Sequence, residues 1–201
     1  MIRVKVCGIT NLKDALLVSE MGAYALGFIF YKGSKRYIEP LKAKEIISKL
    51  PPFIIKVGVF VNEKEEDVIK ITETCGLDRI QVLDDDFKIY KKLSSEKIIR
   101  AIRIKDIKDI ETVNKSTYFP LLDKYSDKAL GGTGEAFDWD LLQHIRRDYI
   151  LAGGININNL ALAIKYKPYA LDVSSGLEKE PGIKDEKKVF EFFNFLRQNH
   201  F

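Results

Sequence analysis

Residues 149–176 read YILAGGININNLALAIKYKPYALDVSSG. This stretch holds two short apolar runs, 149–152 and 170–174, on either side of a segment, 158–165, in which apolar residues recur at helical spacing. A strand, a helix and a second strand in this order place the two strands in parallel. The stretch therefore predicts one unit of a parallel α/β sheet.

The same alternation runs along the whole chain of 201 residues. Strands are predicted at 4–7, 24–30, 53–59, 79–83, 98–102, 118–123, 149–152 and 170–174. Helices are predicted at 12–21, 41–49, 64–75, 87–93, 107–114, 139–145, 158–165 and 184–199. Eight such pairs of about 25 residues each close most economically into a (β/α)8 TIM barrel, so we expect an α/β fold with a single domain over residues 1–201. A doubly wound open sheet is the alternative.

The composition excludes several classes of protein. With 46% hydrophobic and 31% charged residues, the chain can bury a core and keep a polar surface, unlike a disordered chain. No apolar stretch approaches the roughly 20 residues that a membrane span requires, so we expect no membrane partner. Residues 1–6 alternate charged and apolar side chains and lack the apolar core of a signal peptide, which predicts a cytoplasmic protein.

Charges and cysteines exclude two further kinds of site. Lys and Arg number 33 against 29 Asp and Glu, and the basic residues are interleaved with acidic ones, so we expect no nucleic-acid partner. The two cysteines, Cys7 and Cys75, are too few for a thiolate metal site, and we expect no metal. With only two histidines in the chain, proton chemistry falls to Cys, Asp, Glu or Lys.

In a TIM barrel the chemistry lies at the carboxyl ends of the strands, and the last two strands end in loops suited to an anion. Gly153-Gly154 follows strand seven, and Ser174-Ser175-Gly176 follows strand eight. Paired glycines let backbone N–H groups approach a phosphate, and serine hydroxyls can donate as well. These loops predict a phosphate site, against the alternative of ordinary turns and helix caps.

Cys7 closes the first strand. Because side chains alternate along a strand, Lys5 and Cys7 share one face while Val4 and Val6 share the other. If the valines pack on the helices, Lys5 points into the barrel, where the adjacent strand eight offers Asp172 as its partner. A Lys5 ammonium below Cys7 favours the thiolate, which can accept a proton. The alternative is a cysteine that serves as a small buried hydrophobe.

Asp123 closes the sixth strand. About 14 residues follow before the next helix, 124–137, including the run GGTG at 131–134, and loops this long are usually functional. A carboxyl at the end of an apolar strand has its pKa raised by desolvation, as a general acid requires. The alternative is an aspartate that caps a helix or turn.

These segments together resemble the phosphoribosylanthranilate isomerase family of tryptophan biosynthesis. The resemblance rests on KVCGIT at 5–10, GFIF at 27–30, SKRY at 34–37, VGVFVN at 57–62, LD at 122–123, GGTG at 131–134, FDW at 137–139, AGGI at 152–155, LDVSSGLE at 171–178 and PG at 181–182. These motifs span essentially the whole chain. The combination of the first motif with LDVSSGLE is highly specific among phosphate-binding barrels.

The resemblance implies an isomerase that needs no cofactor. Its substrate would be a small phosphorylated molecule, N-(5-phospho-β-D-ribosyl)anthranilate, rearranged to 1-(2-carboxyphenylamino)-1-deoxy-D-ribulose 5-phosphate. Asp123 would act as general acid on the ring oxygen and Cys7 as general base at C2′. Arg36 would bind the anthranilate carboxylate. The other implied substrate-binding residues are Gln81, Gly132, Gly153, Gly154, Asp172, Ser174, Ser175 and Gly176.

One motif departs from the family, and two other functions stay open. Where the family usually reads Gln-Leu-His-Gly, this chain has Gln81-Val82-Leu83-Asp84, so a polar contact of the histidine is lost. A histidine-pathway phosphosugar isomerase is one alternative, although an aspartate would be expected at Cys7. A non-catalytic phosphosugar-binding barrel is the other. The sequence leaves open whether the protein is a monomer or a homodimer.

Overall fold

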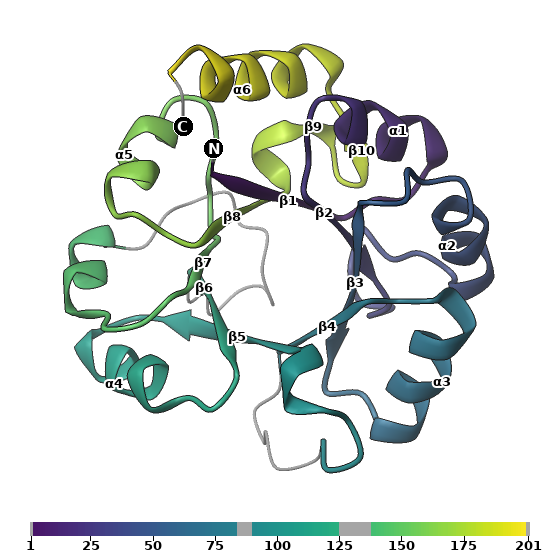
Figure 1. The fold of residues 1–201 in the computed structure, drawn as a ribbon, viewed down its shortest axis with the longest axis horizontal. Helices are drawn as coiled ribbons and strands as arrows, with labels where there is room; N and C mark the ends of the chain where they lie inside the picture. The colour runs from purple at the N-terminus through teal and green to yellow at the C-terminus, as the bar shows by residue number, and fades with distance from the viewer. Residues whose placement is uncertain (1, 84–89, 125–137, 200–201) are drawn as a thin grey trace.

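Eight parallel strands form a closed barrel in the computed structural model, which describes residues 2–83, 90–124 and 138–199. The strands are hydrogen-bonded in chain order, and β1 also pairs with β8, which closes the ring. The helices lie around the outside of this ring (Figure 1). The predicted (β/α)8 barrel is therefore confirmed, and the alternative of an open sheet is wrong.

The strands and helices follow the predicted alternation. The barrel strands are β1 (Arg3–Cys7), β2 (Ala25–Ile29), β3 (Ile55–Val61), β4 (Arg79–Leu83), β5 (Ile98–Ile104), β6 (Phe119–Lys124), β7 (Ile150–Leu151) and β8 (Ala170–Val173). The α-helices are α1 (Leu12–Glu20), α2 (Pro40–Ile47), α3 (Glu65–Cys75), α4 (Ile107–Lys115), α5 (Leu160–Lys165) and α6 (Glu186–Gln198). None of the helices in the described ranges has both the length and the apolar character needed to cross a membrane.

Two of the predicted helices differ from the structure. Residues 90–93 are not helical, and the short 3₁₀ helix η2 (Ser95–Lys97) follows them. The backbone N–H groups of Lys92 and Leu93 donate to the carboxylate of Glu65 instead of to carbonyls of a helix. Residues 139–144 form the 3₁₀ helix η3 (Trp139–His144). Its buried residues, Trp139 and Leu142, are three apart, which is the period of this tighter helix.

A small hairpin after strand eight was not predicted. The 3₁₀ helix η4 (Ser175–Leu177) leads into β9 (Glu178–Glu180), which pairs antiparallel with β10 (Ile183–Lys184). Lys184, predicted as the first residue of the last helix, belongs to this hairpin instead. Asp185 then caps α6, since its side chain accepts the backbone N–H of Lys188.

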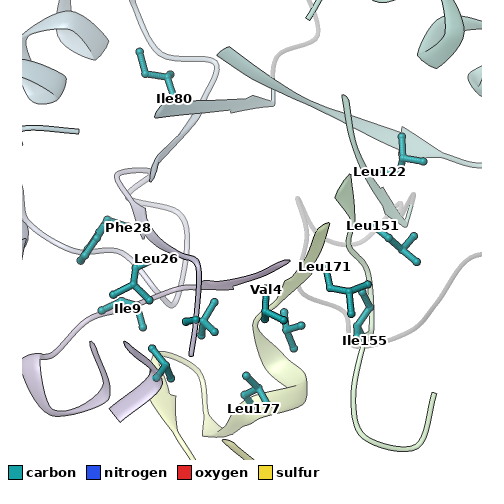
Figure 2. Close-up of a cluster of buried hydrophobic side chains, with 14 of the residues drawn as sticks. Val4, Ile9, Leu26, Phe28, Ile80, Leu122, Leu151, Ile155, Leu171 and Leu177 are labelled. Atoms are coloured by element: carbon teal, nitrogen blue, oxygen red, sulfur yellow. The ribbon is translucent and has the colours of Figure 1, made fainter. Parts of the chain in front are cut away.

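The barrel has an outer and an inner apolar layer. Outward-facing strand residues such as Val4, Leu26 and Leu171 pack with the helices in the larger core (Figure 2). The inner layer is smaller, and it consists of Ala25, Val57, Ile99, Leu121, Ile150, Ala152 and Ala170. Val4 and Val6 belong to the outer layer, so the predicted alternation of the first strand is confirmed.

Candidate functional site

A cavity of about 130 Å³ opens at the carboxyl ends of the barrel strands. It gathers nine of the predicted site residues, which come from six of the eight strands or the loops that follow them: Cys7, Arg36, Gln81, Asp123, Gly153, Gly154, Asp172, Ser174 and Ser175. Gly176 does not line this cavity, and Gly132 lies outside the described residues. Residues more than 160 positions apart in the chain thus face one space.

Cys7 is buried at the end of β1, directly opposite Gly27 on β2. A Cβ atom added at position 27 would lie 2.7 Å from the Cys7 Sγ and 3.1 Å from the Lys5 Nζ. The missing side chain of Gly27 therefore leaves the space that the thiol and the ammonium occupy. Gly27 is a functional position that the predicted site did not include, although a glycine inside a strand signals a close approach of another group.

Lys5 and Asp172 form the interior ion pair that the sequence predicts. They lie opposite each other in the register of β1 and β8, and the Lys5 Nζ is 2.9 and 2.8 Å from the two carboxylate oxygens. Both side chains are buried. Burial alone would lower the pKa of Lys5, but the Asp172 carboxylate and Cys7 outweigh it and raise that pKa above the ordinary value.

The thiol of Cys7 differs from the predicted thiolate. Burial raises the pKa of Cys7, and the Asp172 carboxylate raises it further, whereas the ammonium groups of Lys5 and Lys184 lower it. Lys5 acts in the predicted direction, but the net shift is the opposite, because desolvation by burial is the largest effect on the pKa of Cys7 and the Asp172 carboxylate adds to it. The resting thiol is therefore protonated, and a proton must leave it before it can act as a base.

The glycine loops after β7 and β8 pack directly on each other. Gly153 and Gly154 have φ angles of 84° and 68°, in the region that favours glycine. The side-chain amides of Asn156 and Asn159 donate to the Gly154 carbonyl at 2.9 and 3.0 Å, which holds this loop in shape. A Cβ atom at Gly176 would lie 2.0 Å from the Ile155 carbonyl oxygen, so only glycine permits this contact.

Arg36 has a partner that sequence analysis did not identify. Its Nε lies 3.0 Å from each carboxylate oxygen of Glu178, and its Nη2 lies 2.7 Å from Oε2. Ser174 is also engaged, since its hydroxyl donates to the Cys7 carbonyl at 3.1 Å. Glu178 is the last residue of the LDVSSGLE motif, which is the only signal in the sequence that it belongs to the site.

Asp123 and Leu83 also line the cavity. Asp123 is half-buried near the end of β6, which β7 and β8 separate from the strand of Cys7. Leu83 ends β4 and lines the cavity, so the position where a histidine was expected is apolar here. The run 131–134, predicted to contribute a binding loop, lies outside the described residues.

The model of the N-(5'-phosphoribosyl)anthranilate (PRA) isomerase family matches residues 4–195. The chain belongs to this family. It is thus an isomerase of tryptophan biosynthesis, as the sequence motifs implied.

Individual PRA isomerases are similar to this chain over nearly their whole length. The enzyme of Thermotoga neapolitana is 44% identical over 198 residues, which cover 96% of this chain and 97% of the relative. The crystal structure of the Thermus thermophilus PRA isomerase has a TM-score of 0.89 and 34% identity, covering 98% of this chain and 99% of that one. A third PRA isomerase, solved in complex with reduced 1-(o-carboxyphenylamino)-1-deoxyribulose 5-phosphate, has a TM-score of 0.84 and 37% identity, covering 98% and 100%.

In the part of the chain that the structure describes, one buried polar atom that faces the cavity has no hydrogen-bond partner. Gln81 is buried on β4, and its Oε1 has no hydrogen-bond partner among the described residues. A buried acceptor left without a donor is costly, so a ligand that supplies one is favoured at this point.

Proposed function

We propose that residues 1–201 act as a single barrel domain that rearranges N-(5-phospho-β-D-ribosyl)anthranilate to 1-(2-carboxyphenylamino)-1-deoxy-D-ribulose 5-phosphate. The observation that carries this proposal is the gathering of Cys7, Asp123 and Arg36 around one cavity with the glycine loop at 153–154. In this proposal Cys7 accepts a proton, Asp123 donates one, and Arg36 binds a carboxylate. The glycine loop binds the phosphate. The substrate carries a group for each of them.

The reaction begins with proton donation by Asp123. Its carboxyl gives a proton to the furanose ring oxygen, the bond from C1′ to that oxygen breaks, and the anilino nitrogen supplies electrons to form a Schiff base. Asp123 suits this step because it stands at the carboxyl end of an apolar strand, half-buried, facing the cavity. No metal or cofactor takes part in this proposal.

Cys7 then removes the proton from C2′ of the Schiff base. The electrons left behind form the C1′–C2′ double bond of an enolamine, and the electrons of the C=N bond return to nitrogen. The enolamine tautomerises to the ketone as C1′ gains a proton and the hydroxyl at C2′ loses its own. A raised thiol pKa limits the thiolate population but makes that thiolate a stronger base for this step. β6 and β1 stand apart on the ring of strands, so acid and base reach the sugar from different sides.

The remaining residues bind the ends of the substrate. The planar guanidinium of Arg36 suits the anthranilate carboxylate, and Gln81 Oε1 suits a sugar hydroxyl. The loops of Gly153, Gly154, Ser175 and Gly176 bind the phosphate, chiefly through backbone N–H groups. Asp172 holds Lys5 beneath Cys7, and Ser174 holds the Cys7 backbone, so both serve the substrate through Cys7.

The test is the decay of fluorescence of freshly generated phosphoribosylanthranilate upon addition of purified protein. We expect rapid decay that Cys7→Ala slows by about 10²- to 10⁴-fold, with no metal or cofactor added. The phosphosugar substrate of the histidine-pathway isomerase is the control, and we expect no turnover of it. Binding of phosphoribosylanthranilate without turnover would support the non-catalytic alternative, and turnover of the control alone would support the histidine-pathway alternative.

A further inference from the structure

Arg36 is held on one side by a carboxylate that is itself almost fully buried. The side chain of Glu178 is 4% exposed and that of Arg36 is 12% exposed. The carboxylate accepts from both Nε and Nη2, which is the two-pronged geometry that fixes a guanidinium plane most strongly. Glu178 therefore determines the direction in which Arg36 faces the cavity.

Glu178, the first residue of β9, is in turn held by other groups of the hairpin to which it belongs. The Nζ of Lys184, a fully buried side chain, lies 2.9 Å from Glu178 Oε1, and the backbone N–H of Gly182 donates to the same oxygen at 3.3 Å. Lys184 Nζ also donates to the Cys7 carbonyl at 2.7 Å. Arg36 and Lys184 together hold the pKa of Glu178 below its ordinary value, although burial acts in the opposite direction.

The stem of Arg36 lies on the backbone that follows Cys7. A Cβ atom at Gly8 would lie 2.6 Å from the Arg36 Cδ, and Gly8 has a φ angle of +78°. With Nε and one N–H of Nη2 directed at Glu178, the three remaining N–H donors of the guanidinium have no partner among residues 2–83, 90–124 and 138–199, so within this part of the chain they are available to a ligand. The stem and the fork of Arg36 are thus both fixed before a ligand arrives.

We propose that Glu178, anchored by Lys184, is a positioning residue that selects carboxylate-bearing substrates by fixing the orientation of Arg36. This inference rests on the proposed function, in which Arg36 binds the anthranilate carboxylate. If Arg36 acted only through its charge, the Glu178 carboxylate 2.7 Å from Nη2 would weaken the attraction of Arg36 for a substrate carboxylate. The two roles of Glu178 therefore predict opposite effects when its charge is removed.

The test compares two stable ligands in the full-length protein. One is reduced 1-(o-carboxyphenylamino)-1-deoxyribulose 5-phosphate, and the other is the same molecule with a phenyl ring that lacks the carboxyl group. The ratio of their dissociation constants, measured by calorimetry, gives the preference for the carboxylate. In Glu178→Gln we expect this preference to fall by about tenfold to a hundredfold, the range that one charge-assisted hydrogen bond contributes.

Two further variants keep the test interpretable. Glu180→Gln makes the same chemical change at an exposed position of the same strand, and we expect it to leave the preference unchanged. Arg36→Lys keeps the charge and removes the fork, so we expect it to lose the preference to a similar extent. Adding Glu178→Gln to Arg36→Lys is then expected to change the preference no further, because Glu178 acts through the fork.

The contrary outcomes are distinct. A preference that rises in Glu178→Gln, or equal weakening of both ligands, would overturn the positioning role. If Glu178→Gln does not fold, retention of the full preference in Arg36→Lys overturns it as well. A wild-type protein without turnover of phosphoribosylanthranilate would refute the proposed function instead, whereas turnover with an unaltered preference in the variants refutes only the role of Glu178.

Discussion

Cys7 and Gly27 face each other across β1 and β2, and the thiol of Cys7 occupies the space where a side chain at position 27 would begin. The same space receives the ammonium of Lys5, which a Cβ atom at position 27 would approach to 3.1 Å. A single methyl group at this point would therefore disturb both the proposed base and the ion pair beneath it.

We expect Gly27→Ala to lower stability by about 1 to 3 kcal/mol, the usual cost of overpacking an interior, and to lower kcat as Cys7 is displaced. Chemical unfolding and steady-state kinetics measure the two effects. In the double variant Gly27→Ala/Cys7→Ala the sulfur is gone, so we expect part of the lost stability to return. Equal stability of Gly27→Ala and the wild type would show that β2 relaxes away from Cys7.

The Lys5–Asp172 pair makes stability depend on alkaline pH. The pKa of Lys5 is raised above its ordinary value of 10.5, so the folded state holds this proton more tightly than the unfolded state does. The contribution is complete below the unfolded pKa and is lost as pH rises through the folded pKa. We expect the unfolding free energy to fall above pH 10.5, and less steeply in Lys5→Met than in the wild type.

The same pair predicts a large cost for removing one partner. Lys5→Met leaves Asp172 as a buried, unpaired carboxylate, and we expect the free energy of unfolding to fall by about 3 to 5 kcal/mol. Lys5→Met/Asp172→Leu removes both charges, and we expect it to recover most of this loss. A single variant as stable as the wild type at neutral pH would contradict the expected cost of the unpaired charge.

The proposed acid and base predict losses in rate with little loss of fold. Cys7→Ala and Asp123→Asn are each expected to lower kcat by about 10²- to 10⁴-fold, as is typical when a general base or acid is removed. Cys7→Ser should be nearly as impaired as Cys7→Ala, since a hydroxyl ionises far less readily than a thiol. Steady-state turnover of phosphoribosylanthranilate measures both. Near wild-type turnover of Cys7→Ser would contradict the assignment of Cys7 as the general base, and Asp172 would be the next candidate.

The glycine loops predict a phosphate site that depends on backbone rather than on side chains. At Gly154 the φ angle is 68°, which a β-branched residue adopts only with strain, so we expect Gly154→Val to raise KM sharply. Ser175→Ala removes one hydroxyl and should cost at most about 1 to 3 kcal/mol of binding. Titration with inorganic phosphate as a competitive inhibitor checks both variants. An unchanged KM in Gly154→Val would place the phosphate elsewhere.

Sequence alone determined the barrel and the composition of its mouth. Apolar runs at strand length alternate with segments of helical period, and this local pattern is enough to order eight parallel strands. The period of two along a strand placed Lys5 and Cys7 inside and Val4 and Val6 outside. Because carboxyl ends of parallel strands converge, six of the residues that close or follow the apolar runs line one cavity: Cys7, Asp123, Gly153, Gly154, Ser174 and Ser175.

Tertiary structure alone decided which groups these residues contact and how they ionise. Arg36 and Glu178 lie 142 positions apart, and Lys184 reaches Cys7 across 177, separations that no local period reports. The backbone N–H groups of Lys92 and Leu93 likewise donate to Glu65, which lies 27 and 28 positions earlier in the chain. The net shift in the pKa of Cys7 is a balance between burial and the charges of Lys5, Asp172 and Lys184, and that balance exists only once the chain has folded.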